Sequence, residues 1–174
     1  MKMLVYIRLA KKEDLDQIMI IIGEAKKLLK KDGIPQWQSG SPNREMLTED
    51  IAKERAYCLV ADQTIAGVAV LLTTPDPNYA QIDGSWANTS EQYATIHRIA
   101  ISTEFRGQHL SQFMMSNLIS RGLMLGIKNF RIDTHALNQR MQGLIKSQGF
   151  NYRGIVQVDQ TENSARNAYE LNLS

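Results

Sequence analysis

Residues 96–111, IHRIAISTEFRGQHLS, decide the fold of this chain. An apolar strand ends near Ser102, a short turn carries Arg106 and Gly107, and an amphipathic helix is predicted over 106–126. Backbone amides at the start of a helix point outward and carry partial positive charge, so such a junction can bind a phosphate. An ordinary strand-to-helix connection has the same pattern. The chain lacks G-x-x-x-x-G-K-[ST], so a nucleoside-triphosphate loop is not supported.

Hydrophobic periodicity predicts a mixed α/β fold around this junction. The expected elements are a strand at 4–9, helices at 12–31 and 43–54, strands at 56–61 and 65–73 joined by a three-residue hairpin loop, a long loop over 75–91, strands at 92–102 and 129–135, a helix at 139–148, and strands at 152–158 and 165–173. Hairpins make most neighbours antiparallel, whereas the central strand-helix-strand unit makes one pair parallel. We expect one domain, residues 1–174, with about seven strands in a mixed, mostly antiparallel sheet and about four helices on its two faces.

The composition limits the classes of function. The chain has 174 residues, with 20 Lys and Arg against 18 Asp and Glu, and a formal charge of +2. This near balance argues against a nucleic-acid partner, which needs a dense basic face. The apolar runs, such as 18–22, are far too short to span a membrane, so no membrane partner is expected. The single cysteine, Cys58, cannot form an internal disulfide, and a cytoplasmic location is expected.

Four lysines gather near the predicted end of the helix at 12–31, namely Lys26, Lys27, Lys30 and Lys31. Positive charge at that end complements the helix dipole. We interpret the cluster as a solvated helix end, with an anion-binding face as the alternative.

The order of elements resembles the GCN5-related N-acetyltransferase (GNAT) superfamily. The resemblance covers almost the whole chain, from IRLAKKEDLDQI through IAGVAVLL and the junction to FRIDTHALNQRMQGLIKSQGF. In that family the signature Q/R-x-x-G-x-G/A holds the pyrophosphate of acetyl-CoA. The aligned residues are Arg106, Gly107, Gln108, His109, Leu110 and Ser111. Arg106 matches, whereas His109 replaces the first glycine and Ser111 the second small residue, so the resemblance implies that acetyl-CoA still binds as co-substrate.

The resemblance assigns further residues to the co-substrate. Ile99, Ala100 and Ile101 would offer backbone groups to the pantetheine arm, although they are core residues in either case. The resemblance implies that this arm enters like a short extra strand where two parallel strands splay apart at the cofactor site. Asn138 stands where the family often contacts the cofactor, but it would suit a plain helix N-cap equally. Met141, one turn later, would line the same channel or fill the core.

The implied reaction is direct acetyl transfer from a thioester to an amine, which requires proton transfer. A lysine-like amine has a pKa of about 10.4 and must lose a proton to attack. His97 is expected on the strand beside the acetyl group. Asp133 and His135 lie two residues apart on the next strand and should share one face, where an Asp-His pair could tune an imidazole. Ordinary structural roles are the alternative for all three residues.

Many family members protonate the departing thiolate with a tyrosine four residues before the Gly of a Gly-Phe pair, here Gly149 and Phe150. That position holds Ile145, which cannot donate a proton. Tyr152 is another candidate donor, or a residue that packs on the sheet. Cys58 is expected to be buried and inert. No metal is expected, because the three histidines lack ligand spacing.

Two functions are compatible with the resemblance. The first is an acetyl-CoA-dependent N-acetyltransferase acting on a primary amine of a small molecule, with Trp37 and the 75–91 loop as walls of the acceptor pocket. The second is a catalytically weak or inactive acyl-CoA-binding sensor or interaction module, which His109 and Ile145 favour. The terminal strands could also pair two copies into a homodimer.

Overall fold

The computed structural model describes residues 2–159 and 163–174, and the chain forms two compact units. Unit 1 consists of Met1–Leu71 and His97–Asn117, and unit 2 of Leu72–Ile96 and Leu118–Ser174. A strand at Tyr93–Ile101 and a helix at Leu110–Met124 each run through both units. The single domain expected from the sequence stays a prediction.

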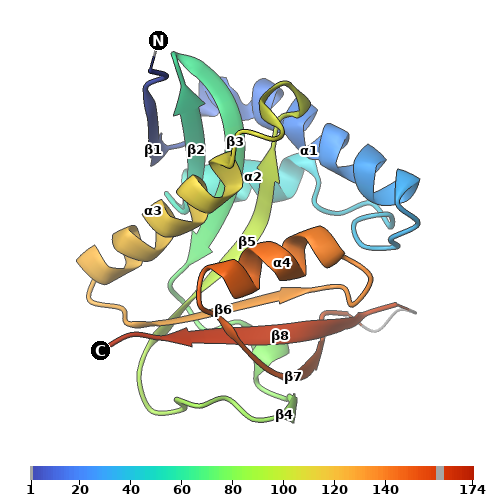
Figure 1. Ribbon diagram of the computed structural model, residues 1–174, viewed down its shortest axis with the longest axis vertical. Helices are drawn as coiled ribbons and strands as arrows, with labels where there is room; N and C mark the ends of the chain where they lie inside the picture. Colours follow the sequence, from blue (N-terminus) through green and yellow to red (C-terminus); the bar gives the residue numbers. More distant parts are fainter. Residues whose placement is uncertain (1, 160–162) are drawn as a thin grey trace. The chain divides into compact units, whose positions relative to one another are not determined.

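The predicted order of helices and strands is confirmed (Figure 1). The described elements are β1 (Val5–Leu9), α1 (Leu15–Lys31), α2 (Arg44–Ala52), β2 (Ala56–Ala61), β3 (Thr64–Leu72), β4 (Asp83–Gly84), β5 (Tyr93–Ile101), α3 (Leu110–Met124), β6 (Asn129–Thr134), α4 (Gln139–Ser147), β7 (Asn151–Gln157) and β8 (Ala165–Asn172), with short 3-10 helices η1 (Lys12–Asp14), η2 (Pro77–Tyr79) and η3 (Thr103–Phe105). The described strands number eight, because the long loop predicted over 75–91 contains β4 as well as η2.

Unit 1 contains β1, β2, β3 and the second half of β5, hydrogen-bonded in that order. β1 and β3 are both antiparallel to β2. Helix α1 buries Leu15, Ile18, Ile21 and Ile22, the spacing of one helical face. α1 packs on α2 and α2 on β2, and every residue of β2 is buried. In Figure 1, α2 passes behind β2 and β3, and the first turns of α3 pass in front of them.

The β2–β3 hairpin turns through two residues, not the three that were predicted. Asp62 and Gln63 have φ values of 45° and 73°, the left-handed conformations that a type I′ turn requires. Thr64 belongs to β3 and pairs with Ala61. The β-branched threonine thus extends the strand, which periodicity alone could not show.

Unit 2 contains the first half of β5, followed in hydrogen-bonded order by β6, β8, β7 and β4. β5 and β6 are parallel, as the strand-helix-strand pattern predicts, and the other pairs are antiparallel. The predicted mixed, mostly antiparallel sheet is therefore confirmed. β8 pairs with β6 on one side and β7 on the other, so this terminal strand has no edge through which a second copy could pair.

The two faces of β6 pack against different parts of unit 2. Phe130 is buried, and its ring lies so close to Gly122 of α3 that a Cβ there would come within 2.4 Å. Arg131 points to the opposite face, where its guanidinium lies 4.2 Å from the ring centroid of Trp86 and 3.8 Å from that of Tyr93. The segment 75–91 therefore covers one face of β6 and α3 the other.

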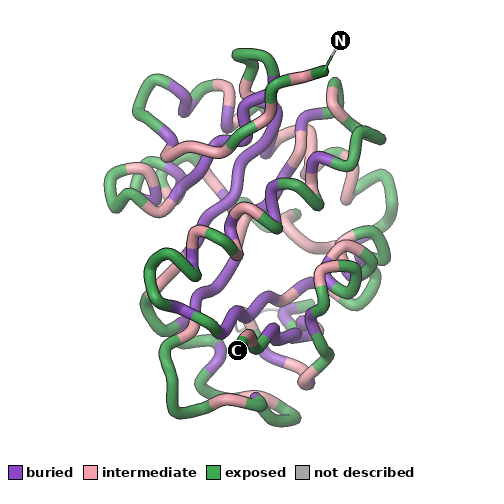
Figure 2. Tube along the Cα trace, turned by 60° about the vertical axis from the view of Figure 1, so that its left-hand side comes forward, coloured by how far each residue is buried: buried purple, intermediate pink, exposed green. Residues whose placement is uncertain are grey.

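Buried residues are concentrated in strands such as β2, β3 and β6. Figure 2 shows long buried runs, in purple, that end in exposed turns. Among the described residues, no helix is long and apolar enough to cross a membrane.

Candidate functional site

The turn between β5 and α3 adopts left-handed backbone conformations at two positions. Gly107 has φ 79° and His109 has φ 59°. Helix α3 consequently begins at Leu110, and the prediction of a helix from Arg106 onward is wrong at its start. A left-handed residue cannot continue a right-handed helix. His109 thus takes a conformation for which glycine is normally selected, at the position of the missing signature glycine.

The geometry of this turn suits an anion. Arg106, Gly107, Gln108 and His109 are exposed, whereas Leu110 is buried and anchors the start of α3. The first amides of a helix have no partner within it and point outward with partial positive charge. The predicted pyrophosphate residues therefore lie together at one helix N-terminus, and Arg106 adds a full charge.

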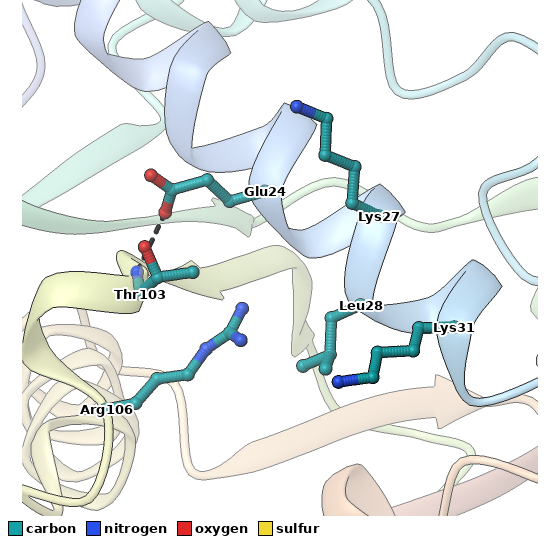
Figure 3. A pocket seen from close by; sticks show the side chains of 6 residues that line it. All are labelled: Glu24, Lys27, Leu28, Lys31, Thr103 and Arg106. Carbon is teal, nitrogen blue, oxygen red and sulfur yellow. Dashed lines mark hydrogen bonds between the residues drawn. The ribbon is translucent and has the colours of Figure 1, made fainter.

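A pocket of about 240 Å³ borders the turn within unit 1 (Figure 3). It is lined by Glu24, Lys27, Leu28 and Lys31 of α1 and by Thr103 and Arg106. Glu24 accepts a hydrogen bond of 2.8 Å from the backbone amide of Thr103, which ties η3 to α1. Arg106 and Lys31 extend toward one another across Leu28, whereas the Lys27 amine points away along the helix (Figure 3). Lys27 and Lys31, two of the four lysines near the end of α1, therefore line a pocket beside the turn that is predicted to bind an anion.

Strand β5 contains a left-handed residue that the sequence did not reveal. Arg98 has φ 53°, a conformation that costs about 1 kcal/mol or more in a non-glycine residue. Its Nη1 lies 3.3 Å from Oδ2 of Asp50, and the Arg55 side chain donates a 2.7 Å hydrogen bond to Oδ1 of the same buried carboxylate. This ion-pair group holds Arg98 in place beside His97, which is half-buried.

The residues predicted to contact pantetheine follow directly after Arg98. Ile99 and Ala100 are buried and Ile101 is half-buried. Gly67 of β3 lies against them, since a Cβ there would come within 2.7 Å of the Ile101 side chain and 3.0 Å of the Ala100 carbonyl oxygen. The close backbone approach fixes the second half of β5 in unit 1; contact with pantetheine stays a prediction.

In unit 2, Asp133 has a partner that sequence reasoning missed. The Tyr79 hydroxyl donates a 2.5 Å hydrogen bond to Oδ2 of Asp133. Tyr79 lies on η2 and is 2% exposed, with its ring packed 5.3 Å from that of Trp86. Burial, and then the charge of Asp133, raises the pKa of Tyr79 well above its usual value. The phenol therefore stays protonated and fixes the orientation of a half-buried carboxylate.

His135 follows β6 directly and is half-buried. Its Nδ1 accepts a 3.1 Å hydrogen bond from the amide of Leu137. Burial lowers the pKa of His135, and the positive charge of Arg166 lowers it further, so the ring is neutral at pH 7. A neutral ring that accepts at Nδ1 carries its proton on Nε2. Because β6 ends at Thr134, the strand alternation used to predict a shared face with Asp133 stops before His135.

The remaining predicted positions in unit 2 have clear structural roles. Asn138 caps α4 by accepting a 3.2 Å hydrogen bond from the amide of Met141, which is half-buried. Ile145 is buried, and its aliphatic side chain has no proton to donate. Tyr152 is 53% exposed and meets Tyr169 edge-on at 5.7 Å. A role for Asn138 or Met141 at a co-substrate stays a prediction.

Two further predicted residues lie in unit 1. Trp37 is half-buried with φ 64°, in the loop between α1 and α2. Cys58 is buried as predicted, 3.7 Å from a carboxylate oxygen of Asp14, and burial raises the pKa of its thiol to about 12. A thiol with that pKa is a poor nucleophile. Across residues 2–159 and 163–174, no group of three or more His, Cys, Asp or Glu could hold a metal ion.

Comparison with known proteins gives a consistent result. A family model described as "Acetyltransferase (GNAT) family" matches residues 23–150. A GNAT-family acetyltransferase structure from Streptococcus agalactiae is 35% identical, with a TM-score of 0.88 over 98% of this chain and 96% of that chain. One from Listeria monocytogenes is 20% identical, with a TM-score of 0.76 over 97% and 95% of the two chains, and supports the fold alone. None of the curated proteins compared with the chain matches it.

Proposed function

The chain belongs to the GNAT acetyltransferase family, and we propose that it transfers the acetyl group of acetyl-CoA to the primary amine of a small molecule. The observation that carries the proposal is the turn before α3, left-handed at Gly107 and His109 and adjoined by Arg106. A turn of this kind at a helix N-terminus suits a pyrophosphate. Acetyl-CoA would supply a thioester-activated acetyl group.

Several groups of this chain would hold the co-substrate. The amides from Gly107 to Ser111 and the Arg106 side chain would bind its pyrophosphate. Ile99–Ile101 would offer backbone groups to pantetheine, and Asn138 and Met141 are further proposed contacts of the co-substrate. In unit 2, the parallel pairing of β5 with β6 ends at Thr95 and Arg131, whereas β6 continues its pairing with β8 to Thr134. This early end of the parallel ladder supports the expected parting of the strands.

Asp133 is the proposed group that receives the proton of the attacking amine. The acceptor attacks as a neutral amine: its nitrogen bonds to the acetyl carbon, the C–S bond breaks and CoA leaves as the thiolate, and the proton that the nitrogen sheds passes to the carboxylate. The hydrogen bond from Tyr79 orients that carboxylate. His135 is less suited to act as a base, because Nδ1 is occupied by Leu137 and Nε2 carries the proton. His135 is therefore proposed as a hydrogen-bond donor, and His97 as a second proton-transfer candidate.

A binding module without transferase activity is the second candidate function. The buried Ile145 favours it, since the position gives no acid for a departing thiolate. The half-buried carboxylate of Asp133, oriented by the Tyr79 hydroxyl, supports an enzyme, because a carboxylate held in place can accept a proton. We also propose a cytoplasmic location. Trp37 and the segment 75–91 stay the proposed walls of the acceptor pocket.

Calorimetric titration of the purified chain with acetyl-CoA tests the proposal. The wild type is expected to bind with a micromolar Kd, and Arg106→Glu to weaken binding by about 100-fold, because a charge-assisted contact becomes a repulsion. Lys30→Glu, an exposed change outside the pocket, serves as the control and should bind like the wild type. Failure of the folded wild type to bind acetyl-CoA would overturn the proposal.

His109→Gly is expected to tighten acetyl-CoA binding by about three- to tenfold. The substitution removes the Cβ at this left-handed position and so lets the backbone approach the phosphates more closely. The matched control is His109→Ala, which keeps the Cβ and should bind within about twofold of the wild type. Titration and thermal unfolding measure both variants. Equal affinities for the glycine and alanine variants would show that the backbone at 109 does not limit binding.

A further inference from the structure

The pocket of Figure 3 holds more positive charge than its own residues balance. Lys31 and Arg106 reach into it from two elements, over the apolar side chain of Leu28. Within the described parts of the chain, neither cation has a hydrogen-bond or ion-pair partner. The carboxylate of Glu24 is engaged by the Thr103 amide. Two cations that point toward one another without a counter-ion repel, so a bound anion would stabilise this arrangement.

The lining also indicates the kind of anion. A guanidinium presents a planar fork that matches two phosphate oxygens, and an ammonium supplies a compact charge beside it. A phosphate monoester carries a charge of about −1.5 to −2 at pH 7, which two cations balance. Leu28 offers an apolar surface at the same place, suited to the sugar or base that carries the phosphate.

We propose that this pocket binds a phosphate monoester, and that its physiological occupant is the 3′-phosphate of acetyl-CoA. The inference rests on the proposed function, because acetyl-CoA carries such a monoester in addition to its pyrophosphate. Arg106 adjoins both sites, since it lines the pocket and precedes the turn at Gly107. Lys31 then acts only on the monoester, and its contribution can be measured separately.

Removing Lys31 should affect only ligands with a 3′-phosphate. Titration of the full chain compares acetyl-CoA with 3′-dephospho-acetyl-CoA on the wild type, Lys31→Ala and Lys30→Ala. The wild type should bind acetyl-CoA about tenfold more tightly than the dephospho compound. Lys31→Ala should lose that difference and bind the dephospho compound unchanged. Lys30→Ala removes the same charge from an exposed neighbour outside the pocket and should match the wild type with both ligands.

Other results overturn the inference in recognisable ways. An equal loss for both ligands in Lys31→Ala would place Lys31 at the pyrophosphate, and no loss would exclude the pocket from coenzyme binding. If the wild type binds neither ligand, the proposed function fails, and adenosine 3′,5′-bisphosphate then tests the pocket alone. Binding of that probe that weakens in Lys31→Ala supports a phosphate monoester site with a different source. No binding of the probe removes the site altogether.

Discussion

Glu170→Gln is expected to lower the free energy of unfolding by about 3 kcal/mol, although the new side chain has nearly the same shape. Glu170 is fully buried on β8. Its Oε1 lies 3.1 Å from Nε of Arg153 and accepts a 2.7 Å hydrogen bond from the amide of Ala87, and its Oε2 lies 3.7 Å from Nε of Arg131. Glutamine removes the negative charge, so Arg131 and Arg153 lose their charged partner.

Arg131 accounts for the large loss of unfolding free energy expected in Glu170→Gln. It is buried between the rings of Trp86 and Tyr93, and burial lowers the pKa of its guanidinium. Burial disfavours the charged form of Arg131, and the negative charge of Glu170 acts against that effect. Removing one partner of a buried pair leaves an uncompensated charge, which is why such changes cost more than an exposed ion pair does.

Urea and thermal unfolding measure the effect of Glu170→Gln. A loss of about 3 kcal/mol should lower the Tm by about 6–12 °C in a chain of this size. Glu91→Gln is the matched control, because Glu91 lies in the same network but is exposed, and its carboxylate accepts hydrogen bonds from the side chains of Asn88 and Asn129. That variant should stay within about 0.5 kcal/mol of the wild type. Similar losses of unfolding free energy in both variants would contradict a special role for the buried charge of Glu170.

The same carboxylate explains how a long segment without periodicity becomes ordered. Residues 75–91 could be predicted from the sequence only as a loop whose length favours a functional role. In the structure, Glu170 holds the amide of Ala87, and the Arg131 side chain donates a 2.8 Å hydrogen bond to the carbonyl of Asn88. These partners are 83 and 43 residues apart in the chain, so no local pattern reveals them. Tyr79 lies on this segment, and its place beside Asp133 was missed for the same reason.

Patterns within a few residues of sequence predicted the features that depend on nearby residues. The order of helices and strands and the parallel β5–β6 pair follow from hydrophobic periodicity and connection lengths. The positive φ values of Arg98 and His109 were not predicted: arginine gives no signal for a left-handed position, and histidine at a signature glycine position gives only a weak one. Arg98 is held by Asp50 on α2, and His109 occupies a glycine position of the family signature. The sequence could therefore identify the candidate site but not its backbone conformation.

Asp133→Asn is expected to have the largest effect on catalysis, with kcat lower by about 1,000-fold and acetyl-CoA affinity unchanged. Asparagine can still accept the hydrogen bond from Tyr79, so the fold should persist, but it cannot take a proton from the attacking amine. The measurement is release of free CoA with a panel of amines, alongside titration with acetyl-CoA. Asp16→Asn, the same change at an exposed residue of α1, is the control and should keep full activity.

Tyr79→Phe separates orientation from proton transfer at the same carboxylate. The variant keeps the buried ring and its packing on Trp86 but removes the hydroxyl that fixes Asp133. Because the carboxylate remains able to accept a proton, kcat should fall by about tenfold, far less than in Asp133→Asn, with KM for acetyl-CoA unchanged. The double variant should be no slower than Asp133→Asn alone, since Tyr79 acts only through Asp133. Multiplicative losses would show that Tyr79 acts on the reaction independently, and an active Asp133→Asn would leave His97 as the base.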